Sequence, residues 1–241
     1  VQTCALTISL FLDAMHQANI KGALVGVESA TPEGLKAIYK DFNASCSDLV
    51  DRLRTFREHG VHVLGSFIFG LPTDREETFA ATAALAEEAE LTFAQFVMMT
   101  PFPGTVDFNN WEASMDKDST RIAGIPLTRH WLIPQNLRPK IYTPHPVLSS
   151  EEIRARTQAV WDRFYRLSSI WKRSRCTPTL RSRLAFVLLS KLYRQMYANT
   201  GIATDSARVN RATRLARWIA RPCRRLFQSV PMPQLQVPGS F

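Results

Sequence analysis

The 241-residue sequence contains only four cysteines, and none of them lies close to another. Cys4, Cys46, Cys176 and Cys223 are separated by at least 42 positions, whereas cysteines that hold a metal usually stand two to four residues apart. This spacing excludes a zinc knuckle within the chain. We therefore expect the cysteines to be reduced and structural.

The sequence also lacks a long apolar run and the usual nucleotide-binding motifs. No stretch approaches the roughly 18 apolar residues that a membrane span requires, and the first residues lack the pattern of a signal peptide. A cytoplasmic location is the default prediction. There is no P-loop, dinucleotide fingerprint, nucleophile elbow or zinc-protease helix, and the close pair His59 and His62 has no cysteine or carboxylate at a ligand spacing. We interpret these histidines as solvated or capping side chains, with a metal role as the less favoured alternative.

Acidic residues are scarce in the last third of the chain. Residues 1–150 carry 12 Lys or Arg against 17 Asp or Glu, whereas residues 151–241 carry 18 against 4. The net charges are therefore −5 and +14. This difference predicts two units, with a boundary near residue 150.

What the first 110 residues do contain is an alternation of short apolar runs and amphipathic stretches. Strands are predicted at 22–29, 61–70 and 92–100, with helices over 32–39 and 47–59 and a third helix that begins after Asp74 and carries an apolar stripe from Phe79 to Ala89. Each strand leads into a helix after a few residues, which is typical of parallel βα units covered by helices. Three such units cannot close a barrel, so either the sheet is open or the rest of it lies outside this chain.

Three helix starts have recognisable capping signals. Thr31 before Pro32 predicts an N-cap followed by proline at the first helical position. Asp74 with Glu77, and Ser149 with Glu152, have the spacing of a capping box. Beyond residue 150 helices dominate, at about 151–167, 177–197 and 205–227.

The segment 101–150 is rich in proline, tryptophan and asparagine. Apart from a short helix near 106–115, it is predicted to be a long ordered wrap over one face of the sheet. Trp111, Trp131, Ile133 and Tyr142 need a place to be buried, and this requirement favours order over flexibility.

Candidate site residues follow the strands, because ligands bind at the carboxyl ends of parallel strands. Glu28 ends the first strand, and its carboxylate either contacts a ligand or forms a salt bridge or cap. Gly70 ends the second, where it either allows a flat ligand to approach or makes a tight turn. The third strand opens onto "PFPGT", a rigid shaped loop.

Taken in order, "GVES", "GSFIFGLPTDREETF" and "TPFPGT" resemble the second half of the barrel of radical S-adenosylmethionine (radical SAM) enzymes. The most similar group carries a cobalamin-binding domain upstream. The resemblance implies an α/β fold, a partial parallel (βα) barrel of about three βα units over residues 1–150, followed by a mainly helical, basic C-terminal extension over 151–241. It also implies S-adenosylmethionine, a [4Fe-4S] cluster and, in the cobalamin group, radical methyl transfer to unactivated carbon.

The resemblance assigns roles to particular positions. Glu28 and Ser29 match the strand end that contacts the ribose or methionine part of S-adenosylmethionine. Gly65, Ile68 and Gly70 match the strand that lies along the adenine. The remaining residues belong to the loop near cofactor and substrate, namely Pro101, Gly104 and Thr105.

The sequence departs from this family in one respect. The hallmark CxxxCxxC is absent, so the resemblance implies that the cluster ligands and any cobalamin domain lie outside this chain. We expect a C-terminal fragment that lacks the N-terminal half of the enzyme and is inactive alone. The alternative is a non-catalytic module that binds a membrane surface or a partner and retains the barrel strands as scaffold.

The basic segment from Arg208 to Arg225 places arginines on one face of a predicted helix and apolar residues on the other. Such a helix either packs by its apolar face or lies on an anionic membrane surface. Nucleic acid is the least favoured partner, because no binding motif accompanies the charge. The substrate class stays open between a small molecule and a lipid.

Overall fold

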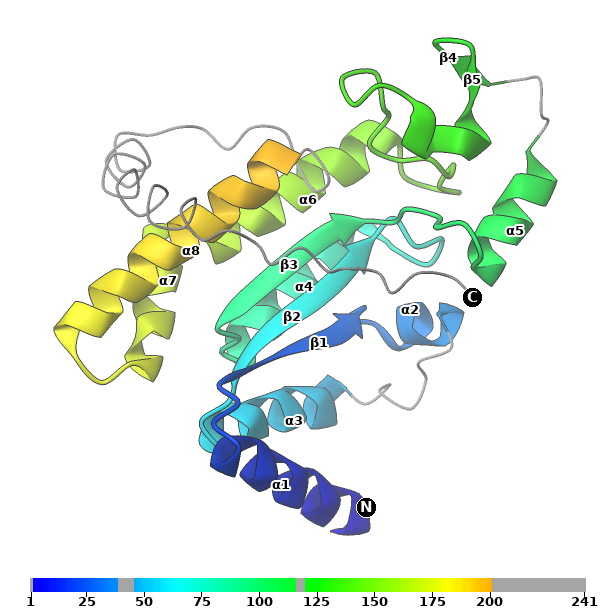
Figure 1. Cartoon of the computed structure of the whole chain (residues 1–241). Coiled ribbons are helices and arrows are strands. Elements are labelled where there is room, and N and C mark those ends of the chain that lie inside the picture. The colour runs from blue at the N-terminus through cyan, green and yellow to red at the C-terminus, as the bar shows by residue number, and fades with distance from the viewer. Residues whose placement is uncertain (1, 39–45, 116–119, 201–241) are drawn as a thin grey trace, which may run out of the picture.

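The computed structural model describes residues 2–38, 46–115 and 120–200 (Figure 1). The first part of the chain contains α1 (Gln2–Gln17), β1 (Gly22–Glu28), α2 (Pro32–Ala37), α3 (Cys46–Glu58), β2 (His62–Phe69), α4 (Glu76–Glu88), β3 (Phe93–Met98) and α5 (Val106–Ser114). The second part contains β4 (Arg121–Ile122), β5 (Ile125–Pro126), η2 (Leu127–Leu132), α6 (Ser150–Phe164), α7 (Leu167–Arg173), η3 (Ser174–Cys176) and α8 (Leu180–Thr200). None of the helices in these ranges is long and apolar enough to cross a bilayer.

The main sheet is parallel, with strand order β1-β2-β3. Gly22 pairs with His62 at the start of the first ladder, and Phe69 pairs with Met98 at the end of the second. Helices α3 and α4 connect the strands, as parallel pairing requires. The predicted α/β class with three βα units and a helical C-terminal region is confirmed, and all three strands end on the side of α2 and α5 (Figure 1).

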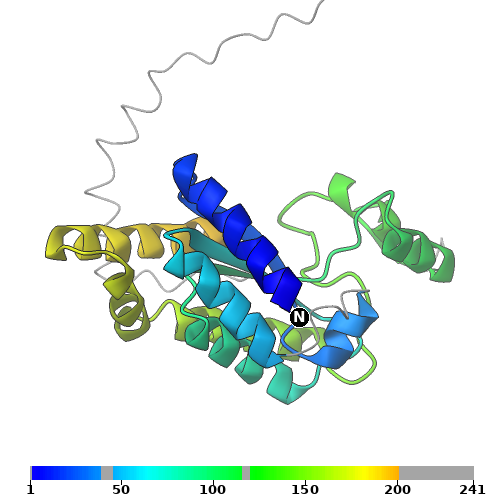
Figure 2. The same cartoon turned by 90° about the horizontal axis from the view of Figure 1, so that it is seen from below.

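The sheet has one well-buried face and one partly exposed face. Residues alternate between the two along β2 and β3, with Phe67, Phe69 and Phe96 at 0–1% exposure on the buried face. Side chains of α3, α4 and α6 share the core with these rings, and Phe69 stacks on Phe79 of α4 at 4.4 Å. Helices therefore cover one face of the sheet, as Figures 1 and 2 both show, whereas fully covered parallel strands were expected.

Aromatic side chains at the C-terminal end of α6 cover the outer edge of β3, namely Trp161 of α6 and Tyr165 directly after the helix. The Tyr165 hydroxyl accepts a hydrogen bond from Ala94 N (3.1 Å) and donates one to Ala94 O (2.7 Å). Trp161 Nε1 donates to Phe96 O at 2.7 Å. An unsealed edge would leave these backbone groups unpaired, so α6 takes the place that a further strand would occupy.

Helix α8 adds a second aromatic layer near the same strand. Phe93 of β3 stacks on Phe186 at 5.7 Å and lies 5.3 Å from the ring of Tyr193. The Tyr197 hydroxyl bonds to Gln95 Oε1, and Gln95 Nε2 donates to Ser66 Oγ at 2.8 Å. The partly exposed face of the sheet is thus covered by α8 where it reaches β3.

Two of the three predicted helix caps are confirmed. Thr31 Oγ1 accepts from Gly34 N at 3.1 Å, and Ser149 and Glu152 form a reciprocal capping box. The predicted box of Asp74 and Glu77 is wrong. Helix α4 starts at Glu76, and the Asp74 carboxylate is buried in the preceding turn, where it binds backbone N–H groups.

The wrap over 101–150 is ordered in its described parts and has a small core of its own. Phe108, Trp111, Leu127, Ile133 and Tyr142 form this cluster. Trp131 was expected to be buried with them, but it is 40% exposed. Its ring instead faces a pocket described below.

The helical region divides differently from the prediction. The helix expected over 151–167 ends at Phe164, and α7 follows as a separate helix. The helix expected over 177–197 runs from Leu180 to Thr200. The predicted basic helix at 205–227, including Arg208 to Arg225, lies outside the described residues.

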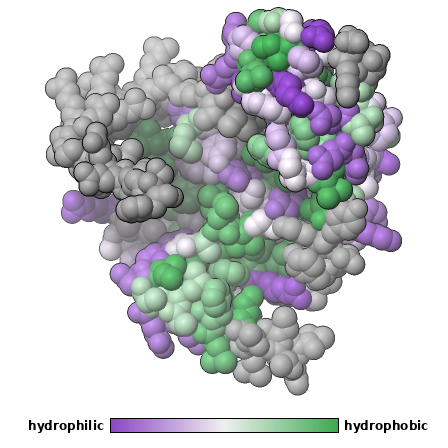
Figure 3. All heavy atoms as spheres, turned by 45° about the vertical axis from the view of Figure 1, so that its right-hand side comes forward, coloured by the Kyte–Doolittle hydropathy of each residue, from purple (hydrophilic) through white to green (hydrophobic). Residues whose placement is uncertain are grey.

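Several large apolar side chains of α1, β1 and the turn between them are exposed. Leu10, Phe11 and Leu24 are exposed by 69%, 61% and 65%, and Ile20 by 45%. Figure 3 shows hydrophobic side chains gathered toward the lower part of the face it presents. Large exposed apolar surface is typical of a contact site.

Candidate functional site

The carboxyl edge of the sheet is where the three strands open onto loops. In a parallel sheet this edge is the usual place for a ligand, because loops and helix N-termini converge there. Here it is bounded by the β1–α2 loop, the turn after Phe69 and the Pro-rich loop after β3. Every sequence-predicted site residue except Gly65 lies in or near this edge.

Glu28 ends β1 in an unusual conformation. Its φ is +68°, and the β1–β2 ladder has an irregularity between Gly26 and Glu28. The left-handed region costs a non-glycine residue about 1 kcal/mol and is often kept where a side chain must be aimed. The side chain is partly exposed, so the geometry suits a ligand contact, and the assigned role stays a prediction.

Ser29 is engaged within the β1–α2 loop. Its side chain is 2% exposed, and its Oγ accepts from Thr31 N at 3.2 Å. A Cβ added to Gly34 would lie 2.2 Å from that oxygen. The hydroxyl therefore packs under the first turn of α2 and fixes the loop that follows Glu28.

Gly65 and Ile68 lie on opposite faces of β2, because an odd separation along a strand reverses the side. Gly65 faces the helices, where an added Cβ would lie 2.6 Å from Leu91 Cδ1. Ile68 lies on the partly exposed face beside Val97. Of the two, only Ile68 presents its side chain to the face that a ligand could reach.

Gly70 forms a clamped turn at the end of β2. Its φ is +93°, which explains the glycine. Asp74 Oδ2 accepts from Gly70 N at 2.8 Å and from Leu71 N at 3.1 Å, while Asp74 N donates to Leu71 O at 2.8 Å. Gly70 thus lies in a tight turn that is held by an Asp74 carboxylate with no exposed surface, and its assigned role beside a ligand stays a prediction.

Burial raises the pKa of Asp74, and the hydrogen bonds from Gly70 and Leu71 oppose that rise. His145 of the wrap lies near this carboxyl, and the charge of a protonated ring at that place lowers the pKa of Asp74. The His145 ring also joins two parts of the fold. Its Nδ1 accepts from Leu148 N at 2.9 Å, which leaves Nε2 to donate to Leu71 O at 2.9 Å.

The loop after β3 is fixed by its own residues and by the wrap. Pro101 is buried, and its carbonyl accepts from His130 Nε2 at 3.0 Å. Gly104 has a φ of +88°. Thr105 Oγ1 donates to Phe102 O at 2.8 Å and accepts from Phe108 N at 3.1 Å, so it caps α5.

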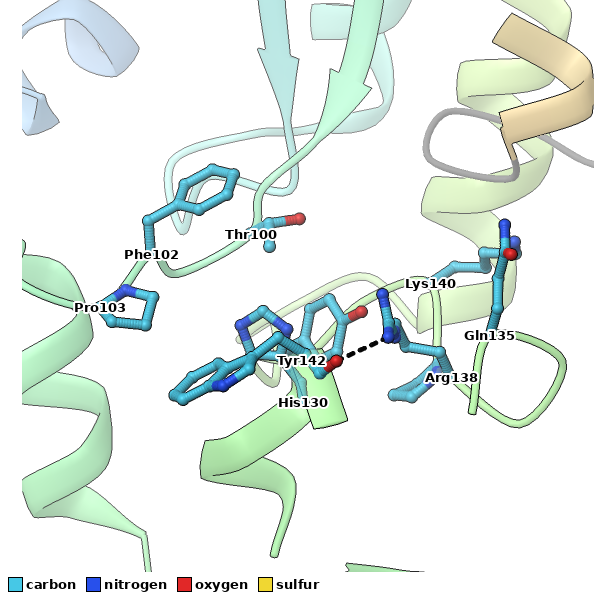
Figure 4. A pocket seen from close by; sticks show the side chains of 10 residues that line it. Thr100, Phe102, Pro103, His130, Gln135, Arg138, Lys140 and Tyr142 are labelled. Atoms are coloured by element: carbon cyan, nitrogen blue, oxygen red, sulfur yellow. Dashed lines mark hydrogen bonds between the residues drawn. The ribbon is translucent and has the colours of Figure 1, made fainter. Parts of the chain in front are cut away.

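A pocket of about 830 Å³ opens beside this loop. This volume is within the roughly 300–1,000 Å³ typical of small-molecule sites. Figure 4 shows Phe102 and Pro103 across the pocket from His130, Tyr142 and Arg138. The full lining is Thr100, Phe102, Pro103, His130, Trp131, Gln135, Arg138, Pro139, Lys140 and Tyr142.

Two groups of the pocket influence each other electrostatically. Burial raises the pKa of Tyr142, and the nearby guanidinium of Arg138 opposes that rise. Arg138 Nη2 donates to Trp131 O at 2.9 Å and to Ile133 O at 2.8 Å. These two hydrogen bonds hold the backbone around Trp131 in place beside the pocket.

The sequence predicted an ordered wrap over 101–150 but did not identify the pocket residues within it. Arg138 and Lys140 lie in a stretch rich in proline and aromatic residues, and this combination of cations with aromatic residues was the sequence signal that could have indicated the pocket. The pairing of His130 with Pro101, 29 residues earlier in the chain, has no sequence signal.

The described residues contain no candidate metal-binding cluster. Within 2–38, 46–115 and 120–200, no three His, Cys, Asp or Glu side chains lie close enough to hold an ion. His59 Nδ1 instead lies 2.7 Å from Asp13 Oδ1, and His62 Nδ1 lies 3.2 Å from Thr92 Oγ1.

No family model matches the chain. Three curated proteins are similar over part of it. An uncharacterized methyltransferase of Pyrococcus horikoshii is 30% identical over 152 residues, which cover 63% of this chain and 30% of that protein. The chain is distantly homologous to methyltransferases.

The other two relatives have named activities. Bacteriochlorophyllide d C-12(1)-methyltransferase of Chlorobaculum tepidum is 33% identical over 84 residues, which cover 35% of this chain and 18% of that protein. Hopanoid C-2 methylase of Rhodopseudomonas palustris is 27% identical over 107 residues, which cover 42% of this chain and 20% of that protein. The chain thus spans less than a third of the length of each curated relative it matches.

Proposed function

We propose that this chain is the part of a radical SAM methyltransferase that binds S-adenosylmethionine at the carboxyl edge of its barrel strands. The supporting observation is the coincidence of two independent features. The three motif-bearing strand ends lie along one edge of a parallel sheet, and the chain is related to methyltransferases. Cobalamin dependence rests on the resemblance of the motifs.

The chain's own residues fit S-adenosylmethionine at the end of β1. Glu28 is a partly exposed carboxylate, and such a group accepts hydrogen bonds from ribose hydroxyls or pairs with an α-amino group. Ile68 supplies an apolar side chain on the face that adenine would contact. Ser29 and the Gly70–Asp74 turn keep the neighbouring loops in place, because their polar groups are bonded within the protein.

The described residues do not fit the ligands of a [4Fe-4S] cluster, so no step through the cluster is assigned to them. In the family that the motifs resemble, cluster and S-adenosylmethionine together supply radical chemistry. Under this proposal the CxxxCxxC ligands and the cobalamin domain belong to sequence outside the 241 residues.

The proposal is tested on the longest protein encoded by the reading frame that contains this chain. Anaerobic reconstitution with iron and sulfide should give iron–sulfur absorbance, and addition of reductant and S-adenosylmethionine should yield 5′-deoxyadenosine. A reading frame without CxxxCxxC, or a cluster-loaded protein that leaves S-adenosylmethionine uncleaved, would overturn it.

A second candidate is a non-catalytic module that lies on a membrane surface. It is favoured by the exposed apolar side chains of α8, where Leu184 and Leu189 are 57% and 56% exposed. The basic segment Arg208–Arg225 follows in the sequence. Co-sedimentation with anionic vesicles at low and high salt tests it, and absence of binding at low salt excludes it.

A further inference from the structure

The pocket beside the loop after β3 has an aromatic lining that is open to solvent in part. Phe102 is 65% exposed and Trp131 is 40% exposed, although both are large apolar side chains. The His130 ring lies 4.3 Å from the ring of Tyr142 and meets Trp131 edge-on at 5.3 Å and 81°. These packed rings form a stiff wall against which a flat apolar molecule can stack.

The wall is held in place from two directions. His130 Nε2 bonds to the carbonyl of Pro101 at 3.0 Å, so the ring is tied to the strand end. Arg138 Nε and Nη2 bond to the carbonyl of Ile133 at 3.2 and 2.8 Å. The shape of the pocket is thus set before any ligand arrives, which reduces the entropic cost of binding.

Both charged side chains that line the pocket are cations. Its ten lining residues include Arg138 and Lys140 but no aspartate or glutamate. All hydrogen bonds of Arg138 within the described part of the chain go to carbonyl oxygens of Trp131 and Ile133. These carbonyl oxygens accept hydrogen bonds from Arg138 but carry no net charge. The positive charge of the guanidinium is therefore not neutralised by them, and it can still attract an anion.

We propose that this pocket binds a flat apolar small molecule that carries an oxyanion, a carboxylate or a phosphate, placed at Arg138 and Lys140. The oxyanion lies toward the two cations, and the apolar body stacks along Trp131 and Phe102. Only one part of this proposal rests on the proposed function, namely that the bound molecule is the acceptor of the methyl group. Binding itself requires neither cluster nor S-adenosylmethionine.

The full 241-residue chain is titrated with three fluorescent probes that share one ring system. These are 1-pyrenebutyrate, 1-pyrenebutyl phosphate and the uncharged 1-pyrenebutanol, followed by anisotropy. We expect at least one of the two anions to bind about tenfold more tightly than the alcohol. Their ranking distinguishes a carboxylate site from a phosphate site, and the preference for the anion should shrink as salt is raised.

Variants locate the effect within the pocket. K140Q and R138Q should each reduce the preference for the anion about fivefold or more, whereas R138K keeps a positive charge and should retain most of it. W131A should weaken all three probes together. K36Q removes an exposed cation of α2, outside the pocket, and should change nothing.

Equal affinity for the anions and the alcohol would overturn the proposal. So would an anion preference that survives in the R138Q/K140Q double variant, provided that its circular dichroism and melting match the parent. Failure of the proposed methyl transfer would leave these binding results unchanged, so the two conclusions fail separately.

Discussion

The β3 side and the β1 side of the sheet differ in how far other side chains cover them. On the β3 side, Trp161 of α6 and Tyr165 directly after α6 are 0% and 2% exposed, and they satisfy backbone groups of the edge strand. On the β1 side, Leu24 is 65% exposed and Phe11 of the neighbouring α1 is 61% exposed. The same sheet therefore has one side sealed by side chains and one side that presents apolar surface.

This difference indicates at which side of the sheet further strands could be added. A further strand cannot pair with β3 without displacing α6, because its edge groups already have partners. The apolar surface of α1 and β1 carries no such obstacle in the described residues, and it is the surface against which the proposed remainder of the barrel would pack. The proposed cofactor residue Glu28 lies at the end of β1, on this open side.

Replacing Trp161 should have the largest effect on the sealed side. Trp161→Ala creates a cavity in the core and leaves Phe96 O without its donor, so we expect a loss of about 4 kcal/mol in the free energy of unfolding. Trp171→Ala is the matched control, because Trp171 is 42% exposed. Urea titrations that give equal losses for the two variants would contradict the sealed-edge description.

A smaller change tests the edge hydrogen bonds alone. Tyr165→Phe keeps the ring but removes the hydroxyl that serves both Ala94 N and Ala94 O, so about 2 kcal/mol should be lost. Tyr142→Phe, whose hydroxyl has no hydrogen bond among the described residues, should cost less than half as much. Hydrogen exchange of the Ala94 amide should accelerate in the first variant only.

Replacing Asp74, which lies in the turn after the central strand β2, should change how the free energy of unfolding depends on pH. Burial raises its pKa, so its stabilising contribution is present at low pH and is lost as the pH rises through the pKa of the folded state. Asp74→Asn keeps a neutral acceptor for Gly70 N. The stability of this variant relative to the parent should therefore increase from pH 3 to pH 7.

Glu77→Gln, at an exposed position of α4, controls for the general loss of a carboxylate. A relative stability of Asp74→Asn that falls as the pH rises would show that the bonds from Gly70 and Leu71 outweigh burial.

The smallest effect is expected on the open side. Leu24→Ser should change the free energy of unfolding by no more than about 0.5 kcal/mol, because the side chain is largely exposed. A loss of about 2 kcal/mol would mean that Leu24 is buried against something, and the contrast between the two sides would disappear.

The sequence was informative where the signal is local. Thr31 and Ser149 cap their helices through contacts within three residues, and these were predicted correctly. Asp74 had the spacing of a capping residue too, but the buried N–H groups of the Gly70 turn compete for its carboxylate. Long-range contacts had no such signal. The bonds from Tyr165 to Ala94 span 71 residues, and no pattern in either segment predicts them.

The binding of S-adenosylmethionine at Glu28 tests the central claim most directly. Equilibrium dialysis of the cluster-loaded, full-length protein should show binding about tenfold weaker in Glu28→Ala. Glu58→Ala, at an exposed position near the C-terminus of α3, should bind like the parent. Equal affinity in all three proteins would contradict the assignment of this sheet edge as the cofactor site.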